Sequence, residues 1–293
     1  MANSTEKINQ IISSLDNKII ELEKRETINV TMRIDEVVPY LKSVLAIAED
    51  DISTRKFDLT QNVTGTATIT YTVNGEPASA GANVLKNGDT LVITVAAGTG
   101  YEIKSIKVNN KNYTSGTAIT VTTDVNVVVV AELQQFALAT QSTGSATITC
   151  TVGGDEVDAG AKALNYGDTL VITATAGEGY EISSLTVNGE TFVSGSSMTV
   201  TGNVSVVAVA QLLKFNLTTQ ATNATISCTV GGDTVTDGTG VLTYGDTLVV
   251  SASADEGYEM DSLTVNGETF VSGSNLTVTS NVSVIASASA VNL

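Results

Sequence analysis

The C-terminal four fifths of the chain is one sequence unit written three times. The phrases FDLTQ, FALAT and FNLTT begin at Phe57, Phe136 and Phe215, and a Gly-Asp-Thr-Leu-Val phrase follows each of them at the same distance, give or take one residue. The period is 78 to 79 residues. A phrase of this length that recurs in register predicts tandem copies of one small domain. We therefore expect domains at 57–135, 136–214 and 215–293, preceded by a segment of residues 1–56.

The repeats have the composition of β-structure. Thr, Val, Ser and Ala dominate them, and Val and Thr suit a pleated, half-buried surface. In repeat 2, residues 146–152 (A-T-I-T-C-T-V) alternate with period two and end at a Gly-Gly-Asp turn, as expected for a strand that enters a hairpin. The sequence predicts a mainly β protein, with three tandem domains of β-sandwich or β-grasp-like type after a short helical N-terminal anchor.

An irregularity is expected inside one strand of every repeat. In repeat 2, Tyr180 and Ile182 fit period two, and so do Leu185 and Val187, but the two pairs are out of phase by one residue. This shift predicts a β-bulge near residues 183–184, and repeats 1 and 3 show the same shift.

Turn chemistry separates the expected strands. Asn188-Gly189 and Asn266-Gly267 predict type I′ hairpins, in a place where repeat 1 has Asn109-Asn110. An aspartate recurs in the Gly-Asp-Thr turn of each repeat, where we expect its carboxylate to bond nearby backbone N–H groups. These aspartates are Asp89, Asp168 and Asp246.

The two cysteines occupy the same position of successive repeats. Cys150 and Cys228 stand where repeat 1 has Tyr71. Equivalent sites of neighbouring domains should lie about a domain length apart, too far for a disulfide. We expect both thiols to be buried as small apolar side chains.

Residues 1–56 have a helical pattern. Residues 4–25 predict a helix with a heptad seam, residues 28–34 a strand, and residues 36–49 a second helix with an apolar stripe. The seam either packs against its own chain or forms a self-associating or docking helix, as a dimer or a trimer. The expected anchor and oligomerisation residues are Ile8, Ile12, Leu15, Ile19, Leu22, Val37, Leu41, Val44 and Leu45.

The absence of His removes much chemistry. It leaves no Ser-His-Asp or Cys-His arrangement and no imidazole ligand for a metal. We therefore predict no enzymatic activity, no catalytic residue and no cofactor. The Gly-Gly-Asp turns at 153–155 and 231–233 could offer oxygen ligands to Ca²⁺, but turn chemistry explains them more simply, so no metal site is predicted.

Charge and hydropathy restrict the partners. The net charge of −17 is concentrated in the last two repeats, which carry −5 and −8. Such a charge repels nucleic acid and anionic membranes. The first residues, MANSTEKINQIISSLDNK, lack a basic start before an apolar core, and no apolar run reaches membrane-spanning length; we thus expect neither a signal peptide nor membrane insertion.

One long phrase carries a family resemblance. G-D-T-L-V-I-T-A-T-A-G-E-G-Y-E-I-S-S-L-T-V-N-G, followed by T-V-T-G-N-V-S-V-V-A, resembles the divergent internalin B-type repeat. The resemblance covers residues 57–293. It implies a small β-rich module, used as a stalk or for binding in bacterial surface proteins and in phage structural proteins. It implies no catalytic residue.

The leading functional hypothesis is a bacteriophage virion protein. The repeats are of a type found on exposed surfaces, yet no export signal is expected. A capsid decoration or head-fibre protein explains both, because it is assembled in the host cytoplasm and displayed on the virion. Residues 1–56 would dock on the major capsid protein or another virion protein, and the distal repeats could touch a host surface or a glycan. The alternative is a bacterial surface adhesin, stalk or glycan-binding module; Tyr101, Tyr180 and Tyr258 would be its candidate carbohydrate platform, if they do not simply pack at strand starts.

Overall fold

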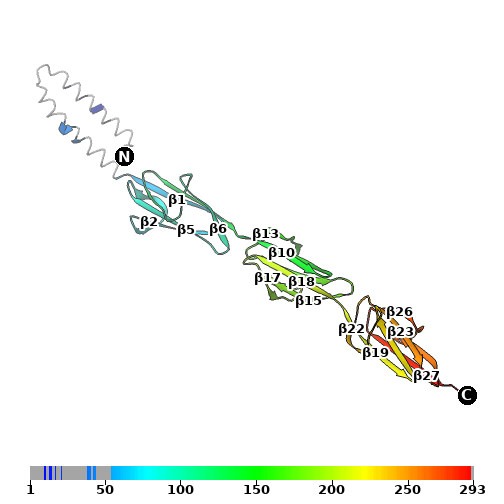
Figure 1. Ribbon diagram of the computed structural model, residues 1–293. Coiled ribbons are helices and arrows are strands. Elements are labelled where there is room, and N and C mark those ends of the chain that lie inside the picture. Colours follow the sequence, from blue (N-terminus) through cyan, green and yellow to red (C-terminus); the bar gives the residue numbers. More distant parts are fainter. Residues whose placement is uncertain are drawn as a thin grey trace. The chain divides into compact units, whose positions relative to one another are not determined.

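The computed structural model describes residues 54–291 without a gap and, before them, residues 10, 13, 14, 17, 21, 38–40, 42 and 43 (Figure 1). These earlier residues have helical conformation, and the Tyr40 hydroxyl donates a hydrogen bond of 2.5 Å to Ser14 Oγ. The expected strand at 28–34 lies outside the described residues. The helical anchor as an element therefore stays a prediction.

Each repeat is a sandwich of two β-sheets, which confirms the mainly β fold with three tandem domains. In repeat 1 the five-stranded sheet has the order β4-β1-β9-β6-β7 and the four-stranded sheet has the order β3-β2-β5-β8. The strands are β1 Lys56–Thr64, β2 Ala67–Val73, β3 Glu76–Ala78, β4 Gly81–Lys86, β5 Thr90–Ala97, β6 Tyr101–Val108, β7 Lys111–Asn112, β8 Ala118–Thr120 and β9 Val125–Leu133.

Repeats 2 and 3 have the same two sheets, in the same strand orders. The strands of repeat 2 are β10 Gln135–Thr143, β11 Ala146–Val152, β12 Asp155–Glu156, β13 Gly160–Asn165, β14 Thr169–Ala176, β15 Tyr180–Val187, β16 Glu190–Thr191, β17 Ser197–Thr199 and β18 Val204–Leu212. Those of repeat 3 are β19 Lys214–Thr222, β20 Ala224–Val230, β21 Asp233–Thr234, β22 Gly238–Thr243, β23 Thr247–Ala254, β24 Tyr258–Val265, β25 Glu268–Thr269, β26 Ser274–Thr277 and β27 Val282–Ala290.

The first and last strands of every repeat lie side by side and run parallel. In repeat 2, β10 pairs with β18 over six residues, from Leu138 opposite Val204 to Thr143 opposite Val209 (Figure 1). Repeats 1 and 3 pair β1 with β9 and β19 with β27 in the same way. Because the two strands point in one direction, the chain enters a repeat at one end of this pair and leaves it at the other.

The expected bulge is confirmed in all three repeats. The register of β15 against β18 shifts between Ile182 and Ser184. The equivalent strands shift between Ile103 and Ser105 in repeat 1, and β24 shifts likewise in repeat 3. The extra residue lets both apolar pairs of the strand face the core in spite of their phase difference.

The expected hairpin turns are also confirmed. Asn188 and Gly189 have φ of +51° and +86°, as a type I′ turn requires. Asn109 and Asn110 adopt the same conformation in repeat 1, at +48° and +65°, because Asn tolerates the left-handed region better than other residues with a side chain.

Each repeat closes its own apolar core. Leu170 and Ile172 of β14 are fully buried in a core that also contains Val204 and Val206 of β18, and the cores of repeats 1 and 3 are built from the equivalent positions. No polar or charged side chain is fully buried in the described part of the chain. The contacts divide the chain between Gln134 and Gln135, so repeats 2 and 3 belong to one compact unit.

Cys150 and Cys228 are free and buried, as expected. Each occupies a core position that Tyr71 fills in repeat 1. Burial raises the pKa of both thiols, with a smaller contribution from Glu156 at the first and Asp237 at the second. Both cysteines therefore stay protonated at neutral pH and serve as packing residues.

Candidate functional site

One aspartate of each repeat stabilises a turn. Asp89, Asp168 and Asp246 each accept a 2.7 Å hydrogen bond from the backbone N–H three residues earlier, as expected from the sequence. Within residues 54–291 and the earlier described positions, no three His, Cys, Asp or Glu side chains gather where they could hold a metal ion.

The Gly-Gly-Asp sequences are tight turns of β-hairpins. Gly153 and Gly154 have φ of +64° and +97°, and Asp155 follows them as the first residue of β12 opposite Val152. Repeat 1 forms the equivalent turn with Asn74-Gly75. Turn geometry therefore accounts for these residues.

Two shallow hollows flank Tyr113 in repeat 1. One, of about 360 Å³, is lined by Asn109 and Lys111, and the other, of about 420 Å³, by Lys104 and Ser105. The Tyr113 ring is fixed, since its hydroxyl bonds the backbone of Ile93 and Thr117. Repeats 2 and 3 have Phe192 and Phe270 at the position of Tyr113 and therefore lack its hydroxyl and the hydrogen bonds that it makes.

The tyrosines expected as a carbohydrate platform begin strands. Tyr101, Tyr180 and Tyr258 are the first residues of β6, β15 and β24. None of the three lines the hollows beside Tyr113. Tyr101 and Tyr180 are half-buried, in line with the packing interpretation, whereas Tyr258 is 38% exposed.

The anchor residues expected in the N-terminal segment all lie outside the described residues. They are Ile8, Ile12, Leu15, Ile19, Leu22, Val37, Leu41, Val44 and Leu45. Docking and oligomerisation through these side chains therefore stay predictions.

A built contact joins repeats 2 and 3 through one residue, Leu213. The Leu213 N–H donates to Gly179 O of repeat 2 at 2.9 Å, and Leu213 O accepts from the Tyr244 N–H of repeat 3 at 2.9 Å. This connector stands between β18 and β19. Because both of its backbone groups are bonded, one to each repeat, its freedom to bend is small.

The side chain of Tyr244 completes the contact. Its ring lies directly on Gly179, where a Cβ would come within 2.3 Å of Tyr244 Cδ1. Its hydroxyl donates a 2.9 Å hydrogen bond to Glu178 Oε1. Gly179 has φ of +76° and is buried, so both the backbone conformation and the ring require glycine there.

Sequence reasoning did not find this contact. Glu178 and Gly179 belong to the phrase E-G-Y, which recurs in repeat 3, and Tyr244 precedes the Gly-Asp-Thr turn; neither phrase by itself indicates a contact between repeats. One feature of the sequence could have indicated the contact: a tyrosine, Tyr166 or Tyr244, precedes the Gly-Asp of repeats 2 and 3, where repeat 1 has Asn87.

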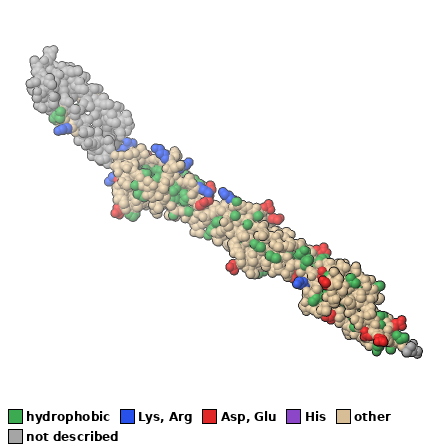
Figure 2. Space-filling view, viewed as in Figure 1, with side chains coloured by type: hydrophobic (Ala, Val, Ile, Leu, Met, Phe, Trp, Pro, Cys, Tyr) green, Lys and Arg blue, Asp and Glu red, His purple; other side chains and the backbone are tan. Residues whose placement is uncertain are grey.

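The visible surface of the repeats is mostly uncharged. In Figure 2 the repeats are covered mainly by backbone and uncharged polar side chains, with Asp and Glu scattered among them. Lys104 carries a local ion pair, at 2.6 Å from Glu102 and 3.9 Å from Glu132. The described part of the chain has no helix of the length and hydropathy needed to cross a bilayer.

Comparison with known proteins identifies a repeat family. The family described as "Divergent InlB B-repeat domain" matches residues 136–210 and 218–291, just over half of the chain. A comparison with curated proteins gave no match.

The solved structures that match this chain are distant in sequence. The TIE protein of Bacillus anthracis is 15% identical, with a TM-score of 0.43, over 81% of this chain and 51% of that one. The pilus adhesin SpaC of Lactobacillus rhamnosus GG is 12% identical, with a TM-score of 0.25, over 81% of this chain and 44% of that one. The chain thus spans about half the length of these proteins or less.

Proposed function

The chain belongs to the divergent InlB B-repeat domain family, and we propose that it is a non-catalytic stalk of a bacterial surface protein, built to carry tension. The observation that carries this proposal is the parallel pairing of the first and last strands in every repeat. The family supports the surface alternative; no finding supports the virion assignment expected from the sequence, or its capsid partner.

The parallel pairing of the first and last strands determines the direction in which a pulling force loads the hydrogen bonds of a repeat. Tension on the chain pulls β10 at its start and β18 at its end, and these points lie at opposite ends of the paired strands. The force therefore shears all the hydrogen bonds between the strands at once, instead of opening them one after another. Resistance to force depends on the unfolding rate, which this geometry keeps low.

The contact through Leu213 extends this logic from repeat 2 to repeat 3. Only this residue separates β18 from β19, and both of its backbone groups are hydrogen-bonded. A force on the last strand of repeat 2 is therefore transmitted to the first strand of repeat 3 without first extending a flexible linker.

Pulling the full chain in two directions tests the proposal. Force-spectroscopy handles at Gln135→Cys and Gln211→Cys load the β10–β18 pair in shear, whereas handles at Gln135→Cys and Gly202→Cys load it from one end. Gly202 tolerates a side chain, because a Cβ there meets nothing within 4 Å. Each event should release roughly 25 nm of chain.

We expect the shear direction to need a several-fold higher force than the unzipping direction. Equal forces would refute a tension-bearing role. The surface location is checked separately, by protease treatment of intact cells that produce the chain: the repeats should be removed while a cytoplasmic marker protein stays intact.

A further inference from the structure

Repeat 3 carries a second copy of the socket that holds Tyr244. Glu256 and Gly257 stand where repeat 2 has Glu178 and Gly179. The Val291 N–H donates to Gly257 O at 3.1 Å, as the Leu213 N–H donates to Gly179 O at 2.9 Å. The backbone is therefore already in the docking conformation, with φ of +87° at Gly257 against +76° at Gly179.

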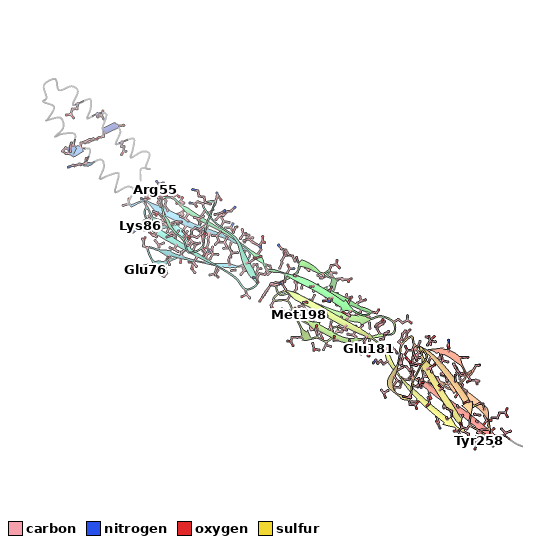
Figure 3. The ribbon with its side chains drawn as sticks, in the orientation of Figure 1. Arg55, Glu76, Lys86, Glu181, Met198 and Tyr258 are labelled. Atoms are coloured by element: carbon pink, nitrogen blue, oxygen red, sulfur yellow. The ribbon has the colours of Figure 1, made fainter. Side chains whose placement is uncertain are left out.

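The copy in repeat 3 is open. A Cβ at Gly257 would meet nothing within 4 Å, whereas at Gly179 it would strike the Tyr244 ring. Gly179 is buried but Gly257 is exposed, and beside it Tyr258 and Val291 are 38% and 48% exposed. Figure 3 shows Tyr258 at the C-terminal end of repeat 3.

We infer that the surface formed by Glu256, Gly257 and Val291 docks a further β repeat of the same family, one that carries a Tyr-Gly-Asp turn. The contact between repeats 2 and 3 shows which chemical groups the partner must provide. It needs an aromatic ring to lie on the glycine and a phenolic hydroxyl for the Glu256 carboxylate. It also needs a backbone N–H for the carbonyl of Val291.

The chain's own repeats show which type of repeat fits. Repeats 2 and 3 have Tyr166 and Tyr244 before their Gly-Asp, whereas repeat 1 has Asn87, which offers neither ring nor phenol. Head-to-tail docking of repeat 1 from a second copy is therefore disfavoured. The partner is a repeat with tyrosine before its Gly-Asp, as in repeats 2 and 3.

The size of the contact sets the condition for docking. One ring and two or three hydrogen bonds are far less than a stable interface between free proteins requires. A covalent link or a crowded assembly raises the effective concentration into the millimolar range, where such a contact is populated. Docking on this surface does not depend on whether the array carries tension.

An extended chain tests the inference. A second copy of residues 214–291 is joined directly after Val291, which preserves the spacing of the contact between repeats 2 and 3. The added repeat alone is labelled with ¹⁵N by segmental ligation, and its rotational correlation time is compared with that of repeat 3 labelled in the same way. Docking predicts equal correlation times.

Three variants of the extended chain separate docking from folding. Gly257→Ala should shorten the correlation time of the added repeat towards that of a free domain, and Glu256→Ala should act in the same direction. Gly267→Ala is the matched control: it has φ of +85° and open space in the same repeat, away from this surface. The inference is overturned if the added repeat tumbles freely in the parent chain, or if Gly257→Ala changes its motion no more than Gly267→Ala does.

Discussion

The Tyr244 hydroxyl of repeat 3 donates a 2.9 Å hydrogen bond to the Glu178 carboxylate of repeat 2. This bond, followed by partial burial and the charge of Glu178, raises the pKa of Tyr244 above its ordinary value of 10.0. Only the protonated phenol can donate. The bond is therefore fully present below pH 10 and is lost as the pH rises through the raised pKa of Tyr244.

Loss of this hydroxyl should loosen repeat 3 from repeat 2. We expect Tyr244→Phe at pH 8 to increase the independent motion of repeat 3 in ¹⁵N relaxation, while both repeats stay folded. Raising the pH above 10 should loosen the parent protein in the same way and leave the variant unchanged. Tyr258→Phe, at an exposed ring, is the control and should have no effect; a rigid Tyr244→Phe protein would show that the hydroxyl is dispensable.

Repeat 1 should lose stability at alkaline pH because of Tyr71. Burial raises the pKa of Tyr71 to about 12, and its hydroxyl donates a 2.6 Å hydrogen bond to Gln61 Oε1. A pKa raised on folding contributes stability that is complete below pH 10 and is lost as the pH rises through about 12. Circular dichroism against pH should show this loss in the parent protein.

The variant Tyr71→Phe should remove that alkaline dependence. At pH 7 it should also lower the free energy of unfolding of repeat 1 by about 1 kcal/mol, since the Gln61 side chain loses its partner. Repeats 2 and 3 have Cys in place of Tyr71 and provide the internal comparison. An unchanged alkaline transition in the variant would assign it to another group.

The two cysteines should be inert until their repeats unfold. Burial raises the pKa of Cys150 and Cys228, and the thiolate is the reactive form. Iodoacetamide at pH 7.5 should leave both unmodified in the native protein and modify both in denaturant, as measured by mass spectrometry. The thiol of Gly202→Cys, at a position with open space for a side chain, is the positive control; native labelling of Cys150 would mean that repeat 2 opens readily.

Truncation of a core side chain in repeat 2 should lower the free energy of unfolding much more than truncation of a surface side chain. Leu170 is fully buried, so Leu170→Ala should lower the free energy of unfolding by about 2–5 kcal/mol. Val193→Ala is the matched control: its side chain is 71% exposed, and its change should stay within about 0.5 kcal/mol. Urea unfolding measures both.

The repeat 1 transition tests whether the cores are separate. The core of repeat 1 contains no residue of repeat 2, so it should unfold at the same urea concentration in the Leu170→Ala variant. A shift of both transitions would contradict independent cores.

Local features of the repeats were predictable because neighbouring residues encode them. The phase difference between Tyr180 and Leu185 predicts the bulge, and Asn188-Gly189 predicts a turn with two positive φ angles. The burial of Cys150 follows from the alternation of its own strand. Each of these depends on residues within one strand or turn.

The sequence by itself determined the number of domains, their β class, the bulges, the turns and the missing imidazole chemistry. Only the tertiary structure decided that β10 lies parallel to β18, and that Tyr244 reaches back to Glu178 and Gly179. The reason is physical. Alternation and turn residues record which side of a strand is buried, but not which distant strand or repeat covers it, and these partners lie 66 residues apart along the chain.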